Sequence, residues 1–285
     1  HKGSVGRAAM NYEVVPDAAF VAAVDLGGTN VRVAIADLSC TIFGDASEKT
    51  SPNGGRDVVK QVAELCRSVM AERELPLAKL RLVVVGVPGV PDAETGAVLM
   101  APNIAHLDEI DFNGELRAEL GVDVIVENDV NLAVLGEHWG GIGHGFDDIA
   151  YIAIGTGIGA GIMVGGELVR GKNGSAGELG YLPFGADPFD EESLRQGALE
   201  RATATDAIRA HYKKLTGEQL QVPEIFDRLN EDENARIVLD SVAKEVARAC
   251  ATIMAITDPE QIIFGGSIGR RTELFERVKL QLARI

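Results

Sequence analysis

The chain has 285 residues, enough for two domains, and its 46% hydrophobic and 25% charged content is typical of a globular protein. Its net charge of -16 disfavours nucleic-acid binding through this part of the chain. Neither a membrane-spanning run nor a signal-peptide core is found, so we expect a cytoplasmic protein that does not contact a membrane. Three widely separated cysteines exclude a disulfide framework.

Apolar strands and helical stripes alternate along the chain. The pattern predicts, in order, a strand–turn–strand over 21–36, a helix over 56–72, strands over 82–87 and 122–126, a helix over 130–139, a second strand–turn–strand over 149–164, a loop-rich stretch over 171–193, a helix over 234–256 and a strand over 261–264. Fully apolar strands that alternate with helices predict an α/β protein with mixed or parallel sheets.

Two domains are expected. Residues 1–20 are interpreted as a linker that remains from a missing N-terminal domain, 21–128 as a small N-terminal α/β domain, and 129–285 as a larger C-terminal α/β domain. The first residue is His, and the last residues have a helical pattern that is still in progress. We therefore expect the chain to be incomplete at both ends.

The glycine-rich turns are the most informative motif, because one pattern occurs twice. Glycine turns let backbone N–H groups approach a phosphate, although tight β-turn geometry alone also explains them. Asp25, just before the first turn, is suited to a water-coordinated Mg²⁺ beside a phosphate; the alternative is a turn-forming Asp. The candidate nucleotide-binding residues are Asp25, Gly27, Gly28, Thr29, Asn30, Gly155, Thr156, Gly157, Gly265 and Gly266.

Two carboxylates are candidates for sugar chemistry. Asp129 follows a strand and precedes a helix, where it is suited either to accept a proton from a sugar hydroxyl or to cap the helix. Glu178 lies in the loop AGELGY, where it is suited to accept hydrogen bonds from sugar hydroxyls or to face solvent.

Taken together, DLGGTNVRVAI, IGTGIGAGIMV and GELVRGKNGSAGELGY resemble the ROK family (repressor, open reading frame, kinase) from about residue 20 to the end. The resemblance implies the actin-like, ribonuclease-H-like ATPase fold, with two α/β domains around a cleft. It also implies that Asp129 is the catalytic base of a family kinase. The sugar-binding positions that it implies are Gly89, Asn103, Asn128, Asp129, Glu178, Tyr181 and Glu200.

The chain departs from the family pattern at its zinc motif. Tyr181 occupies the position where typical members have a histidine, Ala198 stands where the last zinc cysteine would be, and DPFDEESLRQGALE contains no cysteine. A structural zinc centre needs a full set of nitrogen and sulfur ligands, so we expect no zinc and no other metal ligand set of this kind.

These departures, and GRAAMNYEVVPDAAF before the first strand, resemble the zinc-free transcriptional regulators of the family. We therefore expect the sugar-sensing effector domain of a transcriptional regulator that represses carbohydrate metabolism genes. It would bind a sugar effector, contact operator DNA only through a missing winged-helix domain, form a homodimer or homotetramer, and show weak or no catalysis. The alternative is an ATP-dependent sugar kinase of the glucokinase or N-acetylhexosamine kinase type, with ATP and Mg²⁺ as cofactors.

Overall fold

The computed structural model describes residues 13–92, 94–101 and 103–285, and the chain divides into two compact units, His1–Asp129 and Val130–Ile285. Most of the expected linker, residues 1–12, lies outside the described residues. The rest of it carries one short 3₁₀ turn, η1 (Pro16–Ala18), before the first strand. Within the described part of the chain, no helix combines the length and the apolar character that crossing a membrane would require.

The first unit is built on a five-stranded sheet. Its strands are β1 (Phe20–Leu26), β2 (Asn30–Asp37), β3 (Ile42–Lys49), β4 (Leu80–Val87) and β7 (Asp123–Asn128), in the order β3-β2-β1-β4-β7. β2 is antiparallel to both β1 and β3, whereas β1, β4 and β7 run parallel. The carboxyl ends of the three parallel strands therefore lie at the same edge of the sheet.

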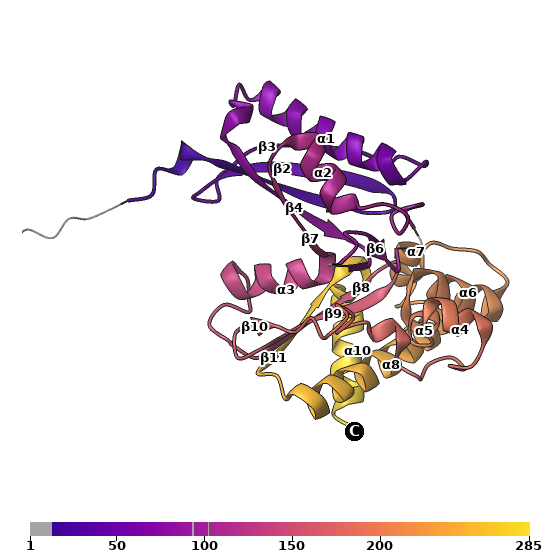
Figure 1. The fold of residues 1–285 in the computed structure, drawn as a ribbon. Coiled ribbons are helices and arrows are strands. Elements are labelled where there is room, and N and C mark those ends of the chain that lie inside the picture. The colour runs from indigo at the N-terminus through magenta and orange to yellow at the C-terminus, as the bar shows by residue number, and fades with distance from the viewer. Residues whose placement is uncertain (1–12, 93, 102) are drawn as a thin grey trace, which may run out of the picture. The chain divides into compact units, whose positions relative to one another are not determined.

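Two helices, α1 (Gly55–Glu72) and α2 (Phe112–Leu120), pack side by side on this sheet (Figure 1). Their apolar stripes enclose a core with the strand side chains, because each helix repeats buried residues at helical spacing. The Asp111 side chain caps α2 by accepting a hydrogen bond from the Gly114 amide at 2.7 Å, and Gly121 ends the helix in the left-handed region. The turn η2 (Leu77–Lys79) leads into β4, and the strands β5 (Val90–Pro91) and β6 (Val98–Leu99) form a small ribbon.

The second unit is built on a four-stranded sheet in the order β10-β9-β8-β11. The strands are β8 (Ile149–Ile154), β9 (Ile158–Val164), β10 (Glu167–Leu168) and β11 (Gln261–Gly265). Helix α3 (Asp129–Gly140) packs on one face through Val134. A Cβ on Gly161 of β9 would lie only 2.6 Å from the Val134 side chain, so this glycine allows the helix to approach the sheet closely.

The opposite face of this sheet is covered by helices. The core on this side includes alternate residues of β8 and β9 and the buried stripe of α8 (Glu233–Thr257). The remaining elements of the unit are η3 (Leu179–Tyr181), α4 (Glu191–Gln196), α5 (Glu200–Thr203), α6 (Thr205–Thr216), α7 (Val222–Asp227), α9 (Gly266–Gly269) and α10 (Thr272–Leu282). Asp258, in the left-handed region with a φ of 44°, ends α8 just before Pro259.

The two units repeat one local topology. In the first, the hairpin β1–β2 has the parallel strand β4 on the other side of β1; in the second, the hairpin β8–β9 has the parallel strand β11 on the other side of β8. Each hairpin is joined by one of the glycine-rich turns of the sequence. The duplicated sequence pattern thus corresponds to a duplicated strand arrangement.

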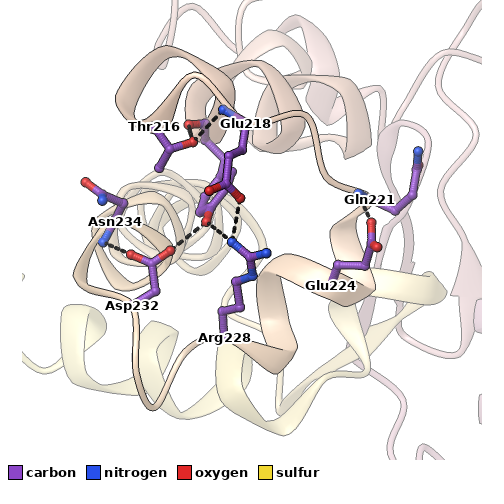
Figure 2. A network of polar contacts seen from close by, with 8 residues as sticks. Thr216, Glu218, Gln221, Glu224, Arg228, Asp232 and Asn234 are labelled. Carbon is purple, nitrogen blue, oxygen red and sulfur yellow. Dashed lines mark hydrogen bonds and ion pairs between the residues drawn. The ribbon is translucent and has the colours of Figure 1, made fainter.

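A polar network connects α6, α7 and the start of α8 (Figure 2). The buried Tyr212 hydroxyl donates to Asp232 Oδ2 at 2.6 Å and accepts from Arg228 Nη1 at 3.0 Å, and Arg228 Nη1 also donates to Glu218 Oε2 at 2.7 Å. The hydrogen bond to Asp232 raises the pKa of Tyr212, and the same bond holds the pKa of Asp232 below its usual range. Asp232 also caps α8 by accepting from the Asn234 amide. The network therefore fixes α6 against the rest of its unit.

Replacement of Tyr212 by Phe removes both hydrogen bonds of this hydroxyl while it retains the ring in the core. We expect Tyr212→Phe to lower the free energy of unfolding by about 1 kcal/mol, the ordinary net value of such a bond. Urea unfolding measures the change. Glu218→Gln is the control, because that side chain is exposed and its ion pair should contribute little. Equal stabilities of the wild type and Tyr212→Phe would contradict the expectation.

Candidate functional site

The first glycine turn joins β1 to β2 and is braced by Thr50. The Gly27 amide donates to the Asn30 carbonyl at 3.0 Å and is therefore engaged within the turn itself. Thr50 Oγ1 donates to the Gly27 carbonyl at 2.5 Å, and the Thr50 amide donates to the Thr29 carbonyl at 3.1 Å. Thr50 lies just beyond β3 and belongs to no sequence motif, so sequence analysis does not single it out.

Gly28 brings the phosphate turn into contact with a predicted sugar-binding residue. A Cβ on Gly28 would lie 2.6 Å from the Asn103 Cβ and 3.0 Å from its carbonyl oxygen. No side chain fits this space, so the close approach of Asn103 requires a glycine at position 28. The structure thus places Asn103 directly beside the predicted nucleotide turn.

We expect Gly28→Ala to destabilise the first unit, because either the turn or the Asn103 backbone must move. Overpacking of this kind costs about 1–3 kcal/mol, and chemical denaturation measures it. Gly136→Ala is the matched control, because no atom outside its own helix backbone lies within 4 Å of a Cβ there. In the α3 interior the added methyl should be neutral or should stabilise by up to about 1 kcal/mol. An equal effect of the two substitutions would contradict the close contact at Gly28.

The remaining predicted binding residues of the first unit lie near the carboxyl ends of β1, β4 and β7. Asp25 is exposed at the end of β1, and Asp129 is exposed at the first position of α3, directly after β7. Asn128 Nδ2 donates to the Gly89 carbonyl at 3.0 Å, which ties the end of β7 to the segment that follows β4. Loops at this edge of parallel strands are where ligands bind in open α/β sheets.

Gly89 and Glu127 support this edge. Gly89 has a φ of +146°, and a Cβ on it would lie 2.4 Å from the Leu99 carbonyl oxygen. Glu127 is 8% exposed, and its Oε1 accepts a hydrogen bond from the Asn128 amide at 2.9 Å. Sequence analysis does not select Glu127, although a carboxylate at the end of an otherwise apolar strand is a signal that could have identified it.

The second glycine turn joins β8 to β9 and contacts the start of α6. The Gly155 amide donates to the Gly157 carbonyl at 2.9 Å, which closes the turn. The Gly155 carbonyl accepts two hydrogen bonds from Thr205, from its amide at 2.9 Å and from its Oγ1 at 2.8 Å. Thr205, the first residue of α6, is a second positioning residue that the sequence does not reveal.

Packing is the first explanation of Gly265, the last residue of β11, and Gly266, the first residue of α9. A Cβ on Gly265 would lie 1.7 Å from the Tyr151 hydroxyl oxygen, and one on Gly266, with a φ of +77°, would lie 2.4 Å from the Ile154 carbonyl oxygen. A Cβ on Gly155 would lie 3.3 Å from Ser267 Oγ, so the β11–α9 junction lies beside the second glycine turn. A nucleotide role for Gly265 and Gly266 stays a prediction.

Glu200 contacts the second glycine turn. Its Oε2 accepts a hydrogen bond from the Ile158 amide at 3.2 Å, and it lies 2.6 Å from where a Gly157 Cβ would be. Burial raises the pKa of Glu200 above its ordinary value, the bond from Ile158 opposes that rise, and the charge of Glu178 adds to it. The two predicted sugar-binding carboxylates are therefore electrostatic neighbours within the second unit.

The loop that carries Glu178 is fixed to β9. The Ala160 amide donates to the Gly177 carbonyl at 2.8 Å, and a Cβ on Gly177 would lie 1.9 Å from the Ala160 carbonyl oxygen. The Leu199 amide donates to the Gly180 carbonyl at 3.0 Å, which ties the same loop to the segment before α5. Glu178, directly before η3, is thus held between two backbone anchors.

The segment that would supply zinc thiolates is closed by other means. The Ala186 amide donates to the carbonyl of the buried Ala198 at 3.2 Å, and the Tyr181 hydroxyl donates to the Arg195 carbonyl at 3.0 Å. Arg201 Nη1 donates to Ser193 Oγ at 2.5 Å and pairs with Asp190 at 3.1 Å. Residues 186–200 contain neither cysteine nor histidine, so the donors present do not fit a structural zinc. Main-chain hydrogen bonds, together with the side chains of Tyr181 and Arg201, close the loop instead.

We expect Glu200→Gln to stabilise the protein at pH 7. The folded state binds the Glu200 proton more tightly than the unfolded chain does. Protonation of Glu200 therefore stabilises the fold fully below about pH 4.3, and this stabilisation is lost as the pH rises through the raised pKa of the folded state. Gln can still accept from Ile158 without a buried charge. The melting temperature of the variant should exceed that of the wild type at pH 7, and the gap should close towards pH 4.

The control for this prediction is Glu191→Gln, which changes an exposed carboxylate on α4. A series of thermal melts between pH 4 and pH 8 tests both variants. If Glu200→Gln were less stable than the wild type at pH 7, charge burial would not be the dominant effect at this residue.

The fold and the paired turns define a two-unit α/β protein with glycine turns suited to phosphate and with carboxylates suited to sugar hydroxyls. The family model for "ROK family" matches residues 21–285. The chain belongs to the ROK family, and the predicted actin-like ATPase fold is confirmed.

The chain is similar to several kinases of this family. A glucokinase from Thermotoga maritima is 34% identical over 88% of this chain and 83% of the relative, and a beta-glucoside kinase from Listeria monocytogenes is 30% identical over 91% and 86%. The structure of a ROK family glucokinase from Streptomyces griseus, in complex with glucose and AMPPNP, matches with a TM-score of 0.76 at 25% identity over 93% of this chain and 89% of that one. A ROK family transcriptional regulator, a homolog of the Escherichia coli MLC protein, shares the fold, with a TM-score of 0.81 at 22% identity over 94% and 70%.

The prediction that this chain is the effector domain of a transcriptional regulator is wrong, because the kinase relatives match it at higher identity and over most of their own length. The prediction depended on the missing zinc ligands and on the residues before β1. Neither feature changes a group that would react. The loop that lacks the zinc ligands can be closed by hydrogen bonds of its own. The kinase alternative describes the chain better.

Proposed function

We propose that this chain is an ATP-dependent kinase of a hexose-type sugar. The single observation that carries the proposal is the position of Asp129, exposed at the carboxyl end of β7, in a chain that is 34% identical to a glucokinase. Asn128, which directly precedes Asp129, is fixed by the hydrogen bond from its side chain to the Gly89 carbonyl. The glycine turns of both units supply backbone donors suited to phosphates.

In the proposed reaction, Asp129 accepts the proton of a sugar hydroxyl while the hydroxyl oxygen forms a bond to the γ-phosphorus of ATP. The bond between the γ-phosphorus and the β,γ-bridging oxygen breaks, and ADP leaves. Glu178 and Glu200 accept hydrogen bonds from other hydroxyls of the sugar, and Asn103 and Asn128 serve the same purpose in the first unit. These residues orient the acceptor, which is the main source of rate in a transfer of this kind.

Asp25 fits a role as ligand of Mg²⁺ through water. It is an exposed carboxylate near the end of β1, separated from Gly27 of the first glycine turn by Leu26 alone, and Mg²⁺ prefers one or two carboxylates together with phosphate oxygens. When bound with ATP, the ion would neutralise negative charge on the phosphates. Thr50 and Thr205 hold the two turns in shape from within their own units.

The test is a coupled assay of ADP release over a panel of hexoses and hexose derivatives. We expect Asp129→Asn to lower kcat by about 10²–10⁴-fold, the usual contribution of a general base, with little change in the affinity for ATP. Asp45→Asn, at an exposed carboxylate on β3, is the matched control and should retain full activity. A wild-type protein that binds a sugar and ATP but transfers no phosphate to any acceptor would refute the proposal.

A further inference from the structure

Gln61, on α1, forms hydrogen bonds on both sides of Thr50. Its Nε2 donates to the Lys49 carbonyl at 2.7 Å, and its Oε1 accepts from the Ser51 amide at 2.9 Å. The same Nε2 also donates to Glu48 Oε2 at 3.2 Å. One side-chain amide therefore holds the backbone before and after Thr50, the residue that braces the first glycine turn.

This pair of backbone bonds requires a side-chain amide. An amide carries a donor and an acceptor on one group, so it can serve a carbonyl and an N–H at the same time. A carboxylate of the same length could accept from the Ser51 amide but could not donate to the Lys49 carbonyl, and its charge would repel that of Glu48. An aliphatic side chain would serve neither backbone group.

Helix α1 gives Gln61 a rigid support. The helix packs against β3 as well as β2. Val58 and Val62, which flank Gln61 along the helix, are buried in the core of the first unit. The helix cannot shift without disturbing this core, because packed interiors have little free space. The two bonds of Gln61 therefore fix Thr50 against an element that does not readily move.

The bonds of Thr50 in turn set the direction of N–H groups in the first glycine turn. Thr50 Oγ1 donates to the Gly27 carbonyl, and the Thr50 amide donates to the Thr29 carbonyl. A peptide group is planar and trans, so a carbonyl that is held in place also fixes the direction of the N–H that follows it. The N–H groups oriented in this way belong to Gly28 and Asn30, two of the predicted nucleotide-binding residues.

The loop over 50–55 also reaches the segment that carries Asn103. The Gly55 amide donates to the Ala105 carbonyl at 2.8 Å, and a Cβ on Gly54, which has a φ of +65°, would lie 1.8 Å from the same carbonyl oxygen. Asn103 itself packs against the first glycine turn. One loop therefore contacts both the turn and the segment beside it, which makes its position important for the site.

We propose that Gln61 is a positioning residue for the nucleotide phosphates. It acts through Thr50, and it holds the N–H groups of the first glycine turn in the orientation that phosphate oxygens need. Donors that are oriented before binding cost less to order when the ligand arrives, so the expected benefit is a higher affinity for nucleotide. The inference rests on the proposed kinase function and adds to it a residue outside every sequence motif.

Calorimetry of AMPPNP binding with Mg²⁺ tests the inference. We expect Gln61→Leu to weaken binding by about tenfold, the effect of losing two ordinary hydrogen bonds. Thr50→Val should weaken it to a similar extent, whereas Thr50→Ser, which keeps the hydroxyl, should bind like the wild type. The double variant Gln61→Leu, Thr50→Val should be little weaker than either single variant, because both residues act on one turn. Ser68→Leu, at an exposed position of the same helix, is the matched control.

Hydrogen exchange tests the positioning without any nucleotide. The Thr50 amide reports directly on the turn, because it donates to the Thr29 carbonyl. In Gln61→Leu this amide should exchange about tenfold faster than in the wild type. The amide of Val62, in the packed part of α1, should exchange at the wild-type rate, which separates a local change at the turn from a general loss of structure.

Three results would overturn the inference: wild-type affinity for AMPPNP in Gln61→Leu, fully additive losses in the double variant, or an equal increase in exchange at Thr50 and Val62. A wild type that binds no AMPPNP would instead count against the proposed kinase function. Exchange at Thr50 then still decides whether Gln61 holds the turn, and an unchanged rate in Gln61→Leu would show that it does not.

Discussion

In each unit, a glycine of the hairpin turn lies in contact with a residue predicted to bind sugar. Gly28 leaves no room for a side chain against Asn103, and Gly157 leaves none against the Glu200 carboxylate. The turn that would bind phosphate and the side chain that would bind sugar are therefore packed together within one unit. If the turn moves, the side chain packed against it must move as well, because well-packed atoms do not move independently.

Each turn is also braced from outside its own hairpin by a threonine. Thr50 holds the first turn from the end of β3, and Thr205 holds the second from the start of α6. The Tyr212 hydroxyl fixes the same α6 helix further along. The second turn is thus connected, through one helix, to the polar network of Tyr212, Arg228 and Asp232.

Much of this fold could be predicted from sequence. The two hairpins, α1, α8, β4, β7 and β11 follow from apolar periodicity, and the glycine turns mark the candidate site. β3 was missed because almost all its residues face solvent, so no alternation is visible in the sequence. Thr50 and Thr205 were missed because a single threonine outside any motif carries no signal until the fold brings it to a turn.

The functional prediction failed for a different reason. The regulator prediction rests on the residues before β1 and on the missing zinc ligands, and weak catalysis is predicted because a loop without zinc would hold the sugar too loosely for transfer. Sequence shows which ligands are missing but not which backbone groups take their place. The bonds from Ala160 to Gly177 and from Leu199 to Gly180 depend on three-dimensional proximity, which residue types do not encode locally.

A loop closed by its backbone has a consequence for how such a protein diversifies. A metal centre would fix the identity of every ligand residue, whereas amide and carbonyl groups are the same for almost any residue. Between the anchors at Gly180 and Leu199, Leu182 and Phe184 pack against the core and Ser193 is buried, so these side chains stay constrained. Exposed positions such as Phe189, Glu191 and Leu194 can change at low risk to the architecture, so they are where related chains are expected to diverge first.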